Sequence, residues 1–165
     1  MNNTIKIYIT DLKEYNSGKL IGERINLNEV TEDELNETIA KYNEEIFISD
    51  FESSFKIEEY TSPLELWSFA QELELLDEQD LLKVEIQINY GLNNFEYALS
   101  NYDNVDLFMG SAEEKAKDAV DDWLYGEIPD SIIHYIDYKA IASDIEIDWT
   151  SDRDDDGNDY LFYIN

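Results

Sequence analysis

The residues of this sequence that could carry out chemistry are almost all carboxylates. The run Asp152-Arg153-Asp154-Asp155-Asp156-Gly157 has the D-x-D-x-D-G spacing that begins a calcium-binding EF-hand loop. Oxygen ligands at its first, third and fifth positions would surround the ion, and the glycine would permit the sharp turn. The twelfth position is Tyr163, where a bidentate Glu is needed, and we expect strands on both sides. A weak calcium site and a solvated acidic turn are therefore the two interpretations of this run.

Other catalytic or metal centres are not indicated. The sequence has no Cys, which excludes disulfides and thiolate zinc sites. Its single His, His134, cannot form a metal site alone. We expect His134 to be a half-buried structural residue beside Tyr135 on a helix. Carboxylates are so frequent that no acid and base pair stands out, and there is no Gly-rich phosphate loop. We therefore expect no enzymatic activity, no bound metal and no cofactor.

Charge is the dominant feature of the sequence. Its 40 Asp and Glu residues oppose 11 Lys and Arg residues, which gives a formal net charge of −29. Hydrophobic residues make up 43% and there are 12 Tyr, so a folded core is expected rather than a disordered acidic tail. Such a charge repels nucleic acid and anionic membranes, whereas it attracts a basic protein and speeds the encounter with it. The N-terminus lacks a signal-peptide pattern and no apolar run approaches the roughly 20 residues that cross a bilayer. We therefore expect a cytoplasmic protein with a basic protein partner.

The elements that must position these carboxylates fall into three parts. In residues 1–60 we expect a strand at 6–10, a hairpin partner at 19–27 with Gly18 in the turn, a helix from Glu32 and a strand at 45–50. Thr31 and Glu34 form the capping box of that helix.

The middle part, residues 61–104, is predicted to be helical. Ser62 and Glu65 form another predicted capping box, with Pro63 at the first helical position. Two further helices are expected at 78–88, with Gly91 as the C-terminal cap, and at 94–100.

The last part, residues 105–165, returns to α+β. A strand is expected at 105–109, and a helix capped by Ser111 and Glu114 follows it. We expect a further helix from about Asp130 and a hairpin formed by 145–149 and 160–164. The inward residues of these two helices are Ala112, Ala116, Ala119, Val120, Trp123, Ile132, Ile133 and Ile136. The predicted fold is α+β, an elongated chain of three small units, although a single globule is not excluded.

The negative charge is spread over all three parts, and it lies between core residues rather than in a tail. A charge of 29 equals that of about 50 Å of duplex DNA, which carries roughly one charge per 1.7 Å. An acidic surface that imitates DNA is therefore one interpretation, and an ordinary or halophilic acidic surface is the other. The carboxylates that we expect to form the DNA-mimicking surface are Glu65, Glu72, Asp77, Glu78, Asp80, Glu114, Asp118, Asp121 and Asp122.

Three blocks of the sequence, in order, resemble the ArdA antirestriction proteins. The first block consists of Tyr8-Ile9, Leu12, Tyr15-Asn16, Gly18 and Leu20-Ile21-Gly22. The second block consists of residues 45–52, Phe55 and residues 59–62. The third block consists of residues 126–129, 135–138 and 143–145. Residues 64–104 match only in helical character and acidity. The resemblance implies an elongated homodimer that imitates bent DNA and binds type I restriction-modification enzymes in place of DNA, on behalf of plasmids, transposons and phages. A module for another basic DNA-binding protein is the alternative.

The resemblance also singles out one short stretch. Tyr135, Ile136, Asp137 and Tyr138 are similar to the region called the antirestriction motif, and we expect them to pack in a core or a dimer contact. The family usually has Gly and Arg before the Asp of the third block, whereas Ala142 and Ser143 stand there in this sequence. An ion pair made by that Arg is therefore not expected.

Overall fold

The computed structural model describes residues 3–42, 45–91, 94–122, 124–154 and 156–165. The chain divides into two compact units, residues 2–102 and residues 103–165, which we call the N-terminal and the C-terminal unit. Each unit contains one three-stranded antiparallel sheet together with helices, so the predicted α+β class is confirmed. The subdivision into three units at residues 60 and 104 stays a prediction.

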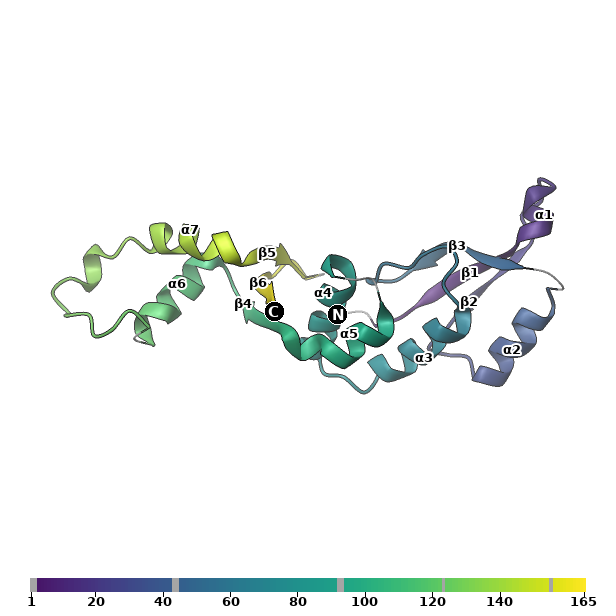
Figure 1. The fold of residues 1–165 in the computed structure, drawn as a ribbon, viewed down its shortest axis with the longest axis horizontal. Helices are drawn as coiled ribbons and strands as arrows, with labels where there is room; N and C mark the ends of the chain where they lie inside the picture. Colours follow the sequence, from purple (N-terminus) through teal and green to yellow (C-terminus); the bar gives the residue numbers. More distant parts are fainter. Residues whose placement is uncertain (1–2, 43–44, 92–93, 123, 155) are drawn as a thin grey trace. The chain divides into compact units, whose positions relative to one another are not determined.

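The three strands of the N-terminal unit all come from its first half. Its elements are β1 (Lys6–Asp11), α1 (Leu12–Asn16), β2 (Gly22–Asn26), α2 (Glu32–Ala40), β3 (Ile46–Glu52), α3 (Pro63–Leu73), α4 (Glu78–Tyr90) and α5 (Phe95–Asn101). The strand order is β2-β1-β3, and Lys6 lies opposite both Asn26 and Glu52. In Figure 1, α2 and α3 follow one side of this sheet, while α1 lies at its far end. The predicted strands and the predicted helices of this unit are confirmed, and α1 is an additional helix that Asp11 caps.

The core of the N-terminal unit lies between the sheet and the helices. Alternate residues of β1 are fully buried, as the two-residue period of a half-buried strand requires. Phe69 of α3 is the largest fully buried side chain, and its ring packs against Phe55 at 5.1 Å and against Phe95 of α5 at 4.7 Å between centroids. These aromatic contacts fix α3 and α5 beside each other.

The C-terminal unit places two helices against its sheet. After a 3-10 turn, η1 (Tyr102–Asn104), its elements are β4 (Val105–Met109), α6 (Ala112–Asp121), a second 3-10 turn η2 (Ile133–Tyr135), α7 (Tyr138–Asp148), β5 (Thr150–Arg153) and β6 (Asp159–Ile164). The strand order is β4-β6-β5. Helices α6 and α7 lie side by side (Figure 1), and the small residues Ala112, Ala116 and Ala142 form the core with Leu161. Phe108, Tyr138, Ile141, Ile145 and Trp149 pack against that core.

Two predictions for the C-terminal unit are wrong. Residues 130–136 form turns and the short η2 rather than a helix, and Ile132 is exposed instead of buried. Residues 145–148 belong to α7, so the strand that pairs with β6 is β5. Tyr138, Ile141 and Ile145 recur at helical spacing and face the core, whereas Ile147 is 79% exposed. The helix period therefore determines the structure of this segment, and the alternation of Ile145, Ile147 and Trp149 does not.

The predicted helix caps have three different outcomes. Thr31 and Ser111 form complete capping boxes with Glu34 and Glu114. Ser62 begins α3 with Pro63 at the first position, but its side chain makes no capping hydrogen bond, so the predicted capping box is wrong. Gly91 follows α4 as the C-cap, but its backbone is not left-handed (φ −101°). A side chain there would collide with the backbone oxygen of Gln87, which explains the glycine.

The N-cap residues Thr31 and Ser62 give a direct stability test. Replacing Thr31 with Ala is expected to lower the free energy of unfolding by about 1 kcal/mol, because Glu34 N–H loses its acceptor. Replacing Ser62 with Ala is expected to change it by less than about 0.5 kcal/mol, because no capping bond is lost. Urea unfolding followed by circular dichroism measures both. If both variants lose the same free energy of unfolding, the capping hydrogen bond of Thr31 makes no difference to stability.

Candidate interaction surface

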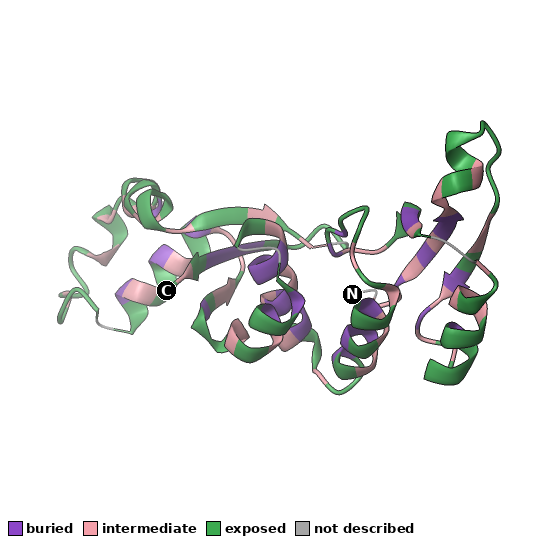
Figure 2. Cartoon of the chain, turned by 45° about the vertical axis from the view of Figure 1, so that its right-hand side comes forward, coloured by how far each residue is buried: buried purple, intermediate pink, exposed green. Residues whose placement is uncertain are grey.

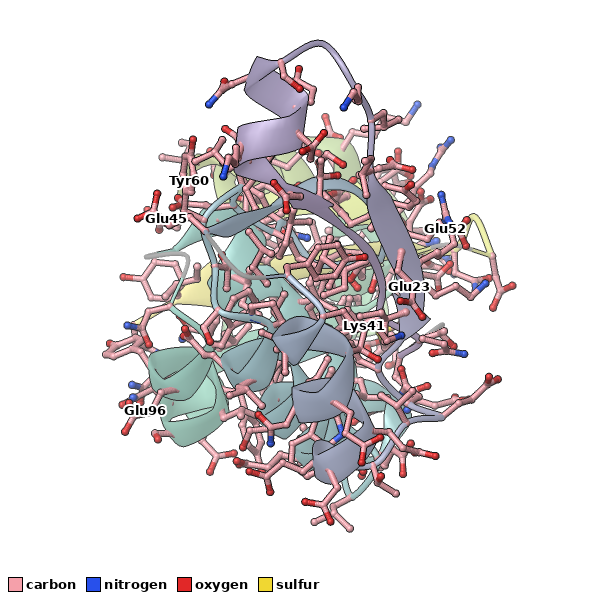
Figure 3. All side chains as sticks on the ribbon, turned by 90° about the vertical axis from the view of Figure 1, so that its right-hand side faces the viewer. Glu23, Lys41, Glu45, Glu52, Tyr60 and Glu96 are labelled. Atoms are coloured by element: carbon pink, nitrogen blue, oxygen red, sulfur yellow. The ribbon has the colours of Figure 1, made fainter. Side chains whose placement is uncertain are left out.

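Eight of the nine carboxylates expected to form an acidic surface are exposed. Glu65 and Glu72 lie on α3, Asp77 and Glu78 at the start of α4, Glu114, Asp118 and Asp121 on α6, and Asp122 directly after α6. The ninth, Asp80, is half-buried and pairs with Lys83 at 3.1 Å. In Figure 3 the labelled side chain of Glu96 points outward from α5. Both units therefore carry exposed acids from this set.

Three of the nine carboxylates also support the fold. The carboxylate of Asp77 accepts hydrogen bonds from the backbone N–H groups of Gln79 and Asp80 and so caps α4. Glu114 accepts from the backbone and hydroxyl of Ser111, and these hydrogen bonds lower the pKa of Glu114. Asp80 forms a salt bridge with Lys83. Each of these three acids therefore has a role in the local structure, which is sufficient to explain its presence.

The acids at the end of α6 have no such explanation. Asp118 and Asp121 occupy the last turn of the helix, and Asp122 is its C-cap. A helix C-terminus carries partial negative charge, so carboxylates there oppose helix formation, and Glu114, Asp118 and Asp122 repel one another at i,i+4 spacing. The last turn contains no basic residue, and the described residues offer none of the three aspartates a salt bridge. Local stability therefore does not account for these three aspartates.

The cations of the protein are largely held by its own carboxylates. On the open face of the first sheet, Arg24 bridges Asp50 and Glu52, and Lys6 also reaches Glu52. Lys19 pairs with Glu14, Lys41 with Glu23 and Arg153 with Asp159; Figure 3 shows Lys41 beside Glu23. In the C-terminal unit, Lys115 lies over the rings of Trp149 at 3.7 Å and Phe108 at 4.8 Å, and this burial lowers the pKa of Lys115. Most of the Lys and Arg side chains are thus engaged within the chain.

The four residues of the Tyr135 stretch have different environments. Tyr135 is 86% exposed, and Ile136 is half-buried. The carboxylate of Asp137 accepts from Ala140 N–H and caps α7, and the ring of Tyr138 packs against the core. His134, expected to be half-buried on a helix, is exposed in η2, so that prediction is wrong. Trp123, expected to face inward, lies outside the described residues.

Exposed apolar side chains gather in the segment that contains Tyr135. Leu124, Tyr125 and Ile132 are all exposed, as is Tyr135 itself. Figure 2 shows the chain between α6 and α7 as mostly exposed. These four side chains come from one short stretch of the chain. Ala142, where the family usually has Gly, is buried between α6 and α7, and the hydroxyl of Ser143 donates to the backbone oxygen of Lys139.

The acidic run begins in β5 with Asp152 and Arg153 and continues into the connection between β5 and β6. Asp154 accepts hydrogen bonds from the backbone N–H groups of Asp156 and Asn158 and from the side chain of Asn158, and these bonds lower the pKa of Asp154. Gly157 takes a positive φ of 84° as the tight turn requires. Asp155 lies outside the described residues, and the described residues contain no cluster of three potential metal ligands. The carboxylate of Asp154 is thus already engaged in closing the hairpin.

A calcium titration tests the alternative interpretation of this turn. Because Asp154 is committed to the hairpin and position twelve lacks a Glu, we expect no saturable heat from millimolar CaCl₂ in a calorimeter. A one-site isotherm that disappears in the Asp154→Asn variant would instead assign the turn as a calcium site.

Among the described residues, no helix has the length and apolar content that crossing a membrane demands. The fold and the excess of carboxylates define an acidic α+β protein. Comparison with protein-family models matches residues 7–158 to the family described as antirestriction protein (ArdA). Because the match covers most of the chain, the protein belongs to the ArdA antirestriction family, as its three sequence blocks predict. This is a family of inhibitors of restriction-modification enzymes rather than of enzymes. A comparison with curated proteins gave no match.

Proposed function

We propose that the protein acts as a DNA mimic that occupies the DNA-binding groove of type I restriction-modification enzymes. It blocks restriction, and modification as well, in the cytoplasm of a bacterial host, and so helps mobile DNA to become established there. The inhibition needs no chemistry, because carboxylates that take the place of phosphates engage the same Lys and Arg side chains that bind DNA.

The observation that carries this proposal is the set of three aspartates at the end of α6. They stand where the helix dipole and mutual repulsion oppose them, and they make no salt bridge among the described residues. A basic partner supplies the missing counter-charge. The nine carboxylates from Glu65 to Asp122 named above form the proposed surface, and the net charge of −29 provides the long-range attraction.

The direct experiment is restriction of unmodified phage by cells that carry a type I system, with and without the protein. Expression is expected to raise the plating efficiency by orders of magnitude. If the efficiency does not change across several type I families while the protein is folded and abundant, the target is a different one. A pull-down at low salt would then identify another basic DNA-binding protein as the partner, which is the alternative function.

We further propose that the protein is a homodimer and that the exposed segment around Tyr135 is part of the contact between the two copies. Its apolar side chains are exposed within the C-terminal unit, and aromatic residues are enriched at the centres of protein interfaces. The neighbouring Asp137 and Tyr138 then act indirectly, since they cap and anchor α7 behind the contact.

Replacing Tyr135 with Asp is expected to weaken the dimer at least tenfold, because a buried interface aromatic residue typically contributes about 2 kcal/mol or more. Tyr60 is the matched control, since it is also an exposed Tyr (71%) but lies in the N-terminal unit. The Tyr60→Asp variant is expected to stay dimeric. Sedimentation equilibrium measures both dissociation constants, and a Tyr135→Asp variant as dimeric as the unmodified protein would remove this segment from the interface.

A further inference from the structure

A groove with acidic walls lies between α3 and α5 in the N-terminal unit. Glu65, Ser68 and Glu72 follow one another at i, i+3 and i+7 on α3 and form one wall. Glu96 and Leu99 of α5 stand opposite them. The cavity has a volume of about 410 Å³, within the usual range of ligand pockets.

The floor of this groove is apolar. It consists of Phe69 and Phe95, whose rings pack at 4.7 Å, and Leu99 adds an aliphatic edge. Phe69 and Phe95 are buried, so this floor is fixed by the core rather than by mobile surface side chains. A long side chain that enters the groove would therefore lay its apolar part on a rigid surface.

The carboxylates of the groove have no cation of their own. No Lys or Arg lines it, and Glu65, Glu72 and Glu96 make no salt bridge within the part of the chain that the structure describes. This contrasts with the sheet face of the same unit, where Arg24 and Lys6 neutralise their neighbours. The groove thus combines an unneutralised negative rim with an apolar floor.

We propose that this groove binds an arginine side chain of the partner protein. The three methylenes of arginine would pack on the floor, and its guanidinium would reach the carboxylates of the rim, where it forms charge-assisted hydrogen bonds. The proposal rests on the proposed function for the identity of the partner, and it adds a specific anchor to a surface that otherwise acts by charge alone. Glu96, which lies outside the nine surface carboxylates predicted from the sequence, becomes one of the recognition residues.

The test uses two small probes on the full-length protein. N-acetyl-arginine amide carries both the stem and the guanidinium, whereas methylguanidinium lacks the stem. In amide-resolved NMR titrations at about 0.15 M salt, where surface attraction is largely screened, we expect shifts from the first probe at residues of α3 and α5. Methylguanidinium is expected to bind at least threefold more weakly, because it makes little contact with the floor.

A charge-matched pair of variants separates the groove from general attraction. The groove variant is Glu65→Gln, Glu72→Gln and Glu96→Gln, and the control variant is Glu29→Gln, Glu32→Gln and Glu37→Gln, all exposed residues of the same unit. The groove variant should lose at least tenfold in probe affinity, and the control less than twofold. Equal losses, or shifts spread evenly over all acidic helices, would overturn the arginine site.

The same two variants show whether the site or the function has failed. If the unmodified protein blocks restriction and both variants lose the same amount of inhibition, the DNA-mimic function stands and the arginine anchor is wrong. If the unmodified protein does not inhibit any type I enzyme, the proposed function is wrong, whereas the probe titration still decides whether the groove binds a guanidinium.

Discussion

Neutralising the three aspartates at the end of α6 is expected to make the protein more stable and a weaker inhibitor at the same time. In the variant Asp118→Asn, Asp121→Asn and Asp122→Asn, the melting temperature should rise by several degrees, because negative charge is removed from the negative end of a helix that has no base in its last turn. Its affinity for the restriction enzyme should fall about 10- to 150-fold if each contact contributes about 0.5–1 kcal/mol. Calorimetric unfolding and direct binding to the purified enzyme measure the two quantities.

This result is informative because stability is expected to rise while affinity for the enzyme falls. A variant that inhibits less because it unfolds would melt earlier, not later. Each single substitution should reduce affinity only about two- to fivefold, because the contacts resemble many individually weak phosphate contacts. The control variant at residues 29, 32 and 37 removes the same charge outside the proposed surface, and it should retain most of the affinity. One single substitution that abolishes binding in a folded protein would contradict a distributed DNA-mimicking surface.

The parts of the fold that depend on local sequence could be predicted. The capping boxes at Thr31 and Ser111 specify where α2 and α6 begin, because the hydrogen bonds involved span only three residues. Strand β4 was predicted with the bounds that it has. By contrast, α1 is only five residues long, which is too short for a hydrophobic period to appear.

The strand predicted at residues 145–149 is wrong because two hydrophobic periods compete there. Residues 145–149 alternate in polarity like a strand, but Tyr138, Ile141 and Ile145 form a helical face that begins at the Asp137 cap. The contact of that face with Ala112 and Ala116 decides the outcome, and a sequence pattern does not contain this packing. The α3 and α5 groove is missed for the same reason, since Glu65 and Glu96 are 31 residues apart and meet only through the Phe69 and Phe95 contact.

Salt is expected to act in opposite directions on the stability of the protein and on its binding. A net charge of −29 on 165 residues opposes the folded state by self-repulsion, and added KCl screens that repulsion. The melting temperature should therefore rise between 20 and 200 mM KCl. The same screening weakens attraction to a basic groove, so the affinity for the enzyme should fall at least about tenfold between 50 and 200 mM, compared with roughly 10³–10⁵ for a DNA ligand with 6–10 phosphate contacts.

Binding has to be measured directly, because restriction activity itself varies with salt through the enzyme's contacts with DNA. Fluorescence anisotropy of labelled protein at several KCl concentrations gives the slope of log affinity against log concentration. The aspartate variant of α6 should show a shallower slope than the unmodified protein, since fewer charged contacts respond to salt. An affinity that does not change with salt would mean that apolar contacts, such as those around Tyr135, hold the complex, and that the carboxylates serve another purpose than imitating DNA.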